Sequence, residues 1–389
     1  MKFWGQGMDF DFSEEQSLLH DSVTRLLADR YGFAARKGFL AAPEGWSPAM
    51  WGHYADLGLL ALPFAEEYGG FGLGATETMI VMEAFGAALA LEPYLPSVIL
   101  CGGILRHAAS LEQKARFLPA LLAGESRFAL AQMEAQSRHD LADVALTAQR
   151  TGAGYVLQGA KSLVLHGDSA DQFIVSARVS GTQRDGQGIG LFLVPADAGG
   201  VERRGYALQD GHRAAEVTFS AVEVAADAVL GEPEGGLPVL ERALDEAVAA
   251  LCAEAVGAMA VAHRLTVDYL KTRQQFGAPI GSFQALQHRA AEMLVALEQA
   301  RGMALYATMM AQEPDAASRR RAMRAAKIQI GRSAKFITQQ AVQLHGGVGV
   351  TMDYAIGHYF KRLTMIDTMF GDADHHLGLL AADPAGLLD

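Results

Sequence analysis

The spacing of apolar positions changes twice along this chain and divides it into three blocks. In the first block, up to about residue 125, apolar residues recur every three or four positions, which predicts amphipathic helices. A capping-box pattern at 13–16 marks the start of the first helix. Further helices are expected near 48–60, 75–90, 95–108 and 111–122. The glycine-rich segment 68–74 is expected to be a loop, because glycines destabilise a helix.

The second block, about 126–232, consists of short runs rich in β-branched and aromatic residues, separated by Gly, Asp and Pro. This pattern predicts strands joined by tight turns, and therefore a small antiparallel barrel or sandwich. The runs are 155–157, 162–165, 173–175, 191–194 and 217–219.

The third block, about 233–389, returns to helical spacing. Its first apolar face is rich in small side chains, which favours close helix packing: Leu240, Leu244, Ala247, Leu251, Ala255, Ala258 and Ala262. Further long helices are expected near 283–311 and 316–344. The predicted fold is therefore α+β and multi-domain, with an N-terminal helical domain (8–125), a middle β domain (126–232) and a C-terminal four-helix bundle (233–389) that also mediates oligomerisation.

Composition and charge exclude several classes of protein. The formal net charge is -12, and nucleic acids and anionic membranes require a basic surface, so neither is an expected partner. No apolar run is long enough to span a bilayer, which needs about 20 residues. Cys101 and Cys252 show neither disulfide nor metal-ligand spacing. The opening residues do not resemble a secretory signal, and Met8 is a candidate start, so we expect a cytoplasmic protein without a metal site.

Two motifs in the third block carry the most specific chemistry. The first is Arg273-Gln274-Gln275-Phe276-Gly277, followed by Ser282-Phe283-Gln284, and the second is Gln343-Leu344-His345-Gly346-Gly347. A guanidinium can bind pyrophosphate in a fork geometry, and adjacent glycines let a ligand approach the backbone. Alternatively, Arg273 could be a cation favoured at a helix C-terminus, and the two glycines could simply end a helix.

Together, in this order, the two motifs resemble those of the acyl-CoA dehydrogenase family, and the resemblance extends over nearly the whole chain. It implies an FAD-dependent α,β-desaturation of an acyl-CoA thioester. In this family, one subunit contributes these motifs to the adenine and pyrophosphate end of its neighbour's FAD. The cofactor-binding residues implied here are Arg273, Gln275, Phe276, Gln284, Gln343, Gly346 and Gly347.

The same resemblance implies that the family's usual catalytic base is absent from its usual position. The segment that aligns with the family's catalytic Glu-Gly-Thr is Phe370-Gly371-Asp372, and Phe370 cannot accept a proton. The alternative position for the base, on the first bundle helix, is Ala247. Glu246 is adjacent but points about 100° away around a helix, so we expect a solvated surface charge there. Asp372 and Glu246 are the two candidate relocated bases, although for Asp372 a helix-capping or polar-surface role is the favoured interpretation.

Residues that would hold the chain's own flavin and substrate are replaced as well. The family's Trp and Thr beside the flavin ring become Leu163 and Leu165, and an expected Arg becomes Val248. The segment 133–140 lacks the family's Gly-Ser turn. His375 and His376 show no metal-ligand spacing and are expected to be structural or exposed.

This pattern of loss resembles the small subunits of two-gene members of the family. The closing segment, with the runs 358–362 and 370–376, most resembles the small subunit of pimeloyl-CoA dehydrogenase. It implies a dimer or tetramer with a base-bearing partner subunit, and an electron-transfer flavoprotein or similar electron acceptor. Two alternatives remain open: a self-sufficient homo-oligomeric enzyme that uses Asp372 or Glu246, and a non-catalytic homologue that has lost the cofactor.

Overall fold

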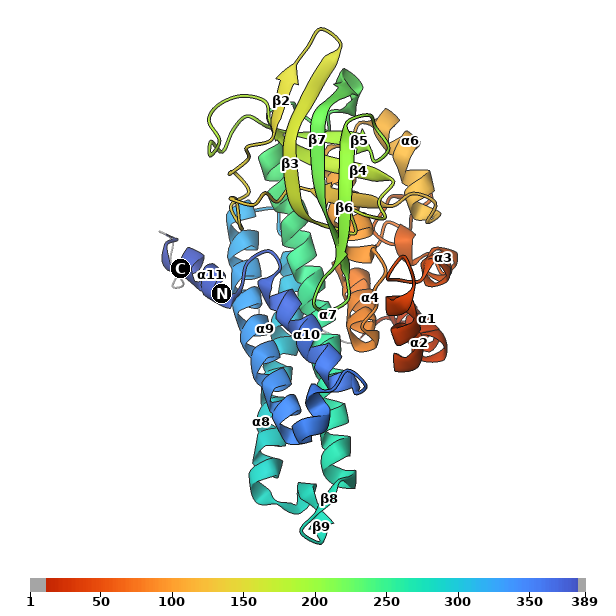
Figure 1. Cartoon of the computed structure of the whole chain (residues 1–389), viewed down its shortest axis with the longest axis vertical. Helices are drawn as coiled ribbons and strands as arrows, with labels where there is room; N and C mark the ends of the chain where they lie inside the picture. The colour runs from red at the N-terminus through yellow and green to blue at the C-terminus, as the bar shows by residue number, and fades with distance from the viewer. Residues whose placement is uncertain (1–11, 384–389) are drawn as a thin grey trace, which may run out of the picture.

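A computed structural model describes residues 12–383 of the chain. The candidate start at Met8, the opening segment and the outer ends of the first and last predicted domains lie outside the described residues. The described chain has a helical N-terminal part, a curled β sheet and a C-terminal helical bundle (Figure 1). The predicted fold class is confirmed. No helix in this part of the chain combines the length and the apolar character needed to cross a membrane.

The N-terminal part begins with the predicted capping box, in which the Ser13 hydroxyl accepts a hydrogen bond from the Gln16 backbone amide and the Gln16 side chain accepts one from the Ser13 amide. The glycine-rich segment forms the predicted loop before α4. The seven residues of η3 form a π-helix, a rare form that is common at functional sites. The elements are α1 (Glu14–Arg30), α2 (Phe33–Ala41), α3 (Pro48–Asp56), η1 (Leu59–Ala61), η2 (Glu66–Tyr68), α4 (Ala75–Ala88), η3 (Leu95–Cys101), α5 (Gly102–Ala108) and α6 (Leu111–Leu122).

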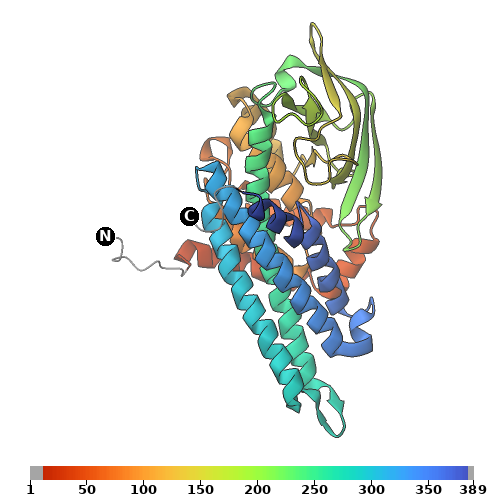
Figure 2. The ribbon, with the colours of Figure 1, turned by 90° about the vertical axis from the view of Figure 1, so that its left-hand side faces the viewer.

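The sheet has seven strands in the order β1-β4-β2-β3-β7-β6, and β5 pairs antiparallel with β4 along its whole length. It is not purely antiparallel as predicted, because β1 runs parallel to β4. Irregular pairing between β3 and β7 interrupts the ladder, and the sheet curls around its own apolar core (Figure 2). The strands are β1 (Phe128–Ala131), β2 (Thr147–Arg150), β3 (Gly154–Leu165), β4 (Gln172–Arg178), β5 (Ile189–Pro195), β6 (Val201–Ala207) and β7 (Arg213–Ala225), followed by η4 (Ala226–Ala228).

The bundle is built on α7, whose 37 residues run from the sheet to the far end of the molecule (Figure 1). Helices α8, α9 and α10 pack with it, and α11 packs on α9. A small hairpin, β8–β9, follows α7 at the end opposite the sheet. The elements are α7 (Gly236–Thr272), β8 (Gln274–Gln275), β9 (Ala278–Pro279), η5 (Ile280–Ser282), α8 (Gln284–Met310), α9 (Ala316–His345), η6 (Gly346–Val350), α10 (Ala355–Thr368) and α11 (Ala373–Ala381).

A buried ion cluster ties the three parts together. Arg362 of α10 binds Glu254 of α7 through two bonds of 2.6 and 2.8 Å, and it binds Asp210 of the β6–β7 turn at 2.8 Å. Arg36 of α2 donates to the backbone carbonyl of Asp210 at 3.0 Å. Buried charges are tolerated only when they are paired and hydrogen-bonded, so this cluster fixes how the three parts meet.

Candidate functional site

The sheet and the bundle enclose a cavity of about 410 Å³, which we call the domain cleft. Three of the residues that replace family positions, Leu163, Leu165 and Phe370, line it together with Asp372. Most of the remaining lining is apolar, namely Pro96, Leu100, Leu130, Met133, Ala135, Leu208, Met365 and Met369, and the polar part is Gln132, Glu134, Arg138, His139, Ser162 and Thr368. The cleft therefore offers a largely apolar surface where the resemblance places a polar, flavin-binding one.

Backbone strain is concentrated around this cleft. Arg138, Leu163 and Phe370 all line it, and all three have left-handed backbone conformations, with φ of 49°, 51° and 58°. Such conformations cost about 1–3 kcal/mol each in residues other than glycine, and they persist only where the surroundings enforce them. The structure thus holds the cleft in a defined shape.

Lys327 of α9 supports the loop that carries Phe370. Its ammonium group is buried and donates to the backbone carbonyls of Ile366, Asp367 and Met369 at 2.5, 3.1 and 2.9 Å. Burial lowers the pKa of Lys327 to about 8. These three bonds satisfy the carbonyls at the C-terminal end of α10, so the loop begins from a fixed point.

Asp372 has the helix-capping position that was one of its expected roles. Its carboxylate accepts a hydrogen bond from the His375 backbone amide at 2.8 Å, at the start of α11. That bond is the main cause that lowers the pKa of Asp372. The side chain also lines the domain cleft, so Asp372 is the candidate base that the structure brings close to Phe370.

A second cavity, of about 510 Å³, adjoins the domain cleft and shares Arg138, His139 and Phe370 with it. The rings of His139 and His375 lie 4.9 Å apart there. Both ring nitrogens of His376 are buried without a hydrogen-bond partner, and burial lowers its pKa to about 3. His376 is therefore neutral and structural. Within residues 12–383, no group of His, Cys, Asp and Glu has a geometry suited to a metal ion.

All seven candidate cofactor-binding residues are exposed. They lie in or next to β8, the start of α8, the end of α9 and the start of η6, and the β8–β9 hairpin is at the end of α7 opposite the sheet (Figure 1). We call this surface the bundle end: Arg273, Gln275, Phe276, Gln284, Gln343, Gly346 and Gly347. The Phe276 side chain is 93% exposed, at the turn of the β8–β9 hairpin.

The two motifs meet at the bundle end because His345 stacks on Tyr269, with ring centroids 4.5 Å apart. Gly346 has a φ of 62°, and a Cβ atom built on either Gly346 or Gly347 would meet nothing within 4 Å. Among the residues that the structure describes, no carboxylate pairs with Arg273. The bundle end therefore combines an unpaired guanidinium with open backbone, as a phosphate-bearing ligand requires.

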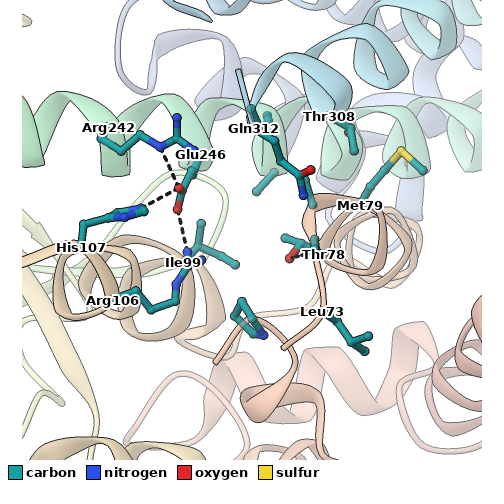
Figure 3. Close-up of a pocket in the computed structure, with 16 residues that line it drawn as sticks. Leu73, Thr78, Met79, Ile99, Arg106, His107, Arg242, Glu246, Thr308 and Gln312 are labelled. Atoms are coloured by element: carbon teal, nitrogen blue, oxygen red, sulfur yellow. Dashed lines mark hydrogen bonds and ion pairs between the residues drawn. The ribbon is translucent and has the colours of Figure 1, made fainter. Parts of the chain in front are cut away.

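Glu246, the other candidate base, lies in a third cavity bounded by α4, α5, α7 and α8 (Figure 3). Its carboxylate accepts bonds from Arg106 at 2.6 Å, His107 at 2.8 Å and Arg242 at 3.1 Å. The expectation of a solvated charge was wrong, because α5 covers this part of α7. Although burial opposes it, this set of donors lowers the pKa of Glu246 to about 2. No pattern in the sequence indicated that Arg106 and His107 contact Glu246.

Comparison with protein families matches the chain to three consecutive models. These are the N-terminal domain of acyl-CoA dehydrogenase at residues 13–125, its middle domain at 129–222 and its C-terminal domain at 234–383. The acyl-CoA dehydrogenase FadE12 of Mycobacterium tuberculosis is 30% identical over 349 residues, which cover 88% of this chain and 89% of FadE12.

Solved structures agree in fold over almost the full length. The ChsE4–ChsE5 complex from Mycobacterium tuberculosis contains a chain that is 25% identical, with a TM-score of 0.86 and coverage of 97% of this chain and 100% of that one. PigA, solved with FAD and proline, is 25% identical, with a TM-score of 0.88 and coverage of 96% and 98%. The fold is therefore one that holds FAD in a similar protein.

Proposed function

This chain belongs to the acyl-CoA dehydrogenase family of FAD-dependent oxidoreductases, and from this premise we propose that it is the small subunit of a heteromeric acyl-CoA dehydrogenase. In this role its bundle end completes the FAD site of a partner subunit, and the partner supplies the catalytic base. The observation that carries the proposal is that all seven candidate cofactor residues are exposed, on two segments that the Tyr269–His345 contact joins near the end of α7.

The bundle end suits the anionic half of FAD. Arg273 has no competing carboxylate, so its guanidinium is available to pyrophosphate oxygens. The open space above Gly346 and Gly347 allows a ligand to reach their backbone. When bound, FAD would accept the two hydrogens that leave the α and β carbons of the acyl-CoA. The residues of this chain hold and orient its adenine and pyrophosphate end, and Phe276 offers an apolar contact beside them.

The domain cleft does not suit a flavin ring and its substrate in the same way. Leu163, Leu165 and Phe370 present hydrocarbon where hydrogen-bonding or proton-accepting side chains are needed. The nearby carboxylate of Asp372 would repel a pyrophosphate. We therefore assign no step of the reaction to this cleft.

A similar protein supports a two-component assembly. The ChsE4–ChsE5 complex contains two differently named proteins, one of which is similar to this chain. We extend this two-component arrangement to the present chain. The resemblance of the closing segment to the small subunit of pimeloyl-CoA dehydrogenase further favours a dicarboxylic acyl-CoA as substrate. We propose a dimer or tetramer that passes its electrons to an electron-transfer flavoprotein or a similar acceptor.

The visible spectrum tests this function directly. We expect the chain purified alone to be colourless, and the complex co-expressed with a base-bearing homologue to be yellow. Arg273→Ala should lower the flavin content of that complex at least several-fold, whereas Arg150→Ala, at an exposed arginine of strand β2, should leave it unchanged. Equal flavin content in both variants would remove Arg273 from the cofactor site.

A self-sufficient enzyme is the second candidate, because Asp372 does line the domain cleft. It predicts a yellow chain, with one flavin per chain, in the absence of any partner. A third outcome, in which neither the chain nor any complex binds flavin, would identify a non-catalytic homologue. The same spectra therefore separate all three functions.

A further inference from the structure

The cavity around Glu246 has no part in the proposed function, and it is chemically distinct from the domain cleft. We propose that this cavity, which we call the Glu246 cavity, binds a small organic monocarboxylate with a short apolar body. Its volume is about 160 Å³, and a cavity of about 150 Å³ in another protein holds a benzene-sized molecule. The proposal does not depend on the small-subunit role.

Charge at one wall of the Glu246 cavity is unbalanced. Arg106 and Arg242 both face the single carboxylate of Glu246, which is ionised at neutral pH, so at least one positive charge remains uncompensated there. Arg242 uses another N–H on the backbone carbonyl of Glu313 at 3.1 Å. The Nε atom of Arg106, in contrast, is buried without any partner. A ligand carboxylate beside the guanidinium groups of Arg106 and Arg242 can neutralise the excess charge.

The other walls suit a short hydrocarbon. Met79, Ile99, Ala249, Ala250 and Ala311 line them, and none of these side chains has a group that requires a hydrogen bond. A polyanion such as inorganic phosphate would leave this apolar surface uncovered, and it carries more than one negative charge, whereas Arg106 and Arg242 exceed Glu246 by one positive charge. The lining therefore favours a ligand with one negative charge and an apolar end.

One polar side chain opposite the ion cluster has no assigned bond. The amide of Gln312, from the end of α8, points into the cavity across from Glu246 (Figure 3). Within the described part of the chain it has no hydrogen-bond partner, so it is available to a second oxygen of the ligand. The hydroxyls of Thr78 and Thr308 line the cavity too, but each already donates to its own helix, to Gly74 and Ala304.

Helix α7 lies between the Glu246 cavity and the cavity that adjoins the domain cleft. Val248 lines the cavity that adjoins the domain cleft, whereas Ala249 and Ala250 line the Glu246 cavity. In the same way Leu100 of η3 faces the domain cleft and Ile99 faces the Glu246 cavity. An occupant of the Glu246 cavity thus contacts elements that also shape the cleft, without entering it.

Ligand-observed NMR on the full chain tests the proposal, with sodium butyrate as the probe. We expect saturable butyrate binding that is at least tenfold tighter than that of 1-butanol, which lacks the charge, and of inorganic phosphate, which lacks the apolar body. Similar affinities for butyrate and 1-butanol, or no saturable butyrate binding, would overturn the proposal.

Two variants test whether butyrate binds in the Glu246 cavity. Arg106→Gln should weaken butyrate binding at least tenfold, whereas Arg320→Gln, which removes an ion pair with Glu241 elsewhere, should not change it. Ala75→Leu, at a half-buried position of the lining, should block binding while Arg106, Arg242 and Glu246 all remain. Unchanged affinity in Ala75→Leu, with an unchanged melting temperature, would show that butyrate binds elsewhere.

Discussion

The imidazole of His345 stacks on the ring of Tyr269, with 4.5 Å between their centroids. This contact joins the end of α9, which precedes Gly346, to the last turn of α7, which precedes Arg273. Two sequence motifs far apart in the chain therefore form one surface because two rings pack beneath it. The position of the bundle end depends on this pair.

Loss of the ring pair should disturb that surface. Tyr269→Leu keeps an apolar side chain but removes the stacking, so we expect a loss of about 1 kcal/mol of stability and a lower flavin content in the assembled complex. Urea unfolding and flavin absorbance measure the two effects. Tyr306→Leu, at an exposed tyrosine of α8, is the matched control and should change neither. A normal flavin content in Tyr269→Leu would mean that the motifs act separately.

The variant Asp372→Asn distinguishes a helix-capping role of Asp372 from a role as catalytic base. Asparagine caps a helix about as well as aspartate, so stability should stay within about 0.5 kcal/mol of wild type. Because the proposed base belongs to the partner, turnover by the assembled complex should also stay the same. Steady-state assays of the complex measure this. A loss of several hundredfold, the range typical of a lost general base, would instead make Asp372 catalytic.

Arg362→Met tests the cluster that joins the three parts. The change leaves Glu254 and Asp210 buried without their cation, which should cost about 3–5 kcal/mol of unfolding free energy. Urea denaturation at neutral pH gives this value. Arg150→Met, the same change at an exposed site, should stay within about 0.5 kcal/mol of wild type. A loss below about 1 kcal/mol would show that the cluster contributes little to the arrangement.

Glu92 should make stability depend on pH. Burial raises its pKa from 4.5 to about 7, although Tyr31 and Tyr54 donate hydrogen bonds to its carboxylate. The folded state therefore holds a proton that the unfolded state releases. The contribution of Glu92 to the unfolding free energy is complete below pH 4.5. It falls as the pH rises and is lost once the pH has passed 7, a total decrease of up to about 3 kcal/mol.

Unfolding free energies of wild type and Glu92→Gln between pH 4 and 8 measure this effect. Glutamine cannot titrate, so the fall in stability over this range should be smaller in the variant by the amount that Glu92 contributes. Glu66→Gln, at an exposed glutamate, should follow the wild-type curve. Parallel curves for Glu92→Gln and wild type would assign the pH dependence to other groups.

Local patterns predicted most of the helices, since each depends on side chains within a few turns. The predicted helix at 111–122 coincides with α6, and the expected 283–311 and 316–344 lie within one residue of α8 and α9 at each end. Strand β1 could not be predicted in the same way. Its four residues are all buried, so they show no alternation, and only tertiary structure brings them parallel to β4. The edge strand β6 is largely exposed and lacks an apolar pattern too.

The candidate site was predictable only where its residues are contiguous. The resemblance identified the motifs of the bundle end, but the exposure of Phe276 and the stacking of His345 on Tyr269 required the fold. The surroundings of Glu246 could not be predicted from the sequence, because its hydrogen-bond partners Arg106 and His107 precede it by about 140 residues. No local pattern indicates such a pairing.

The support that Lys327 gives to the loop before Phe370 has an evolutionary consequence. The lysine binds only backbone carbonyls, which every amino acid supplies, so the path of the loop is independent of the side chain at position 370. A carboxylate there could be exchanged for a phenyl ring without unfolding the surrounding structure. If the chain has the proposed small-subunit role, it can thus lose the carboxylate at this position and still keep the surface that its partner needs.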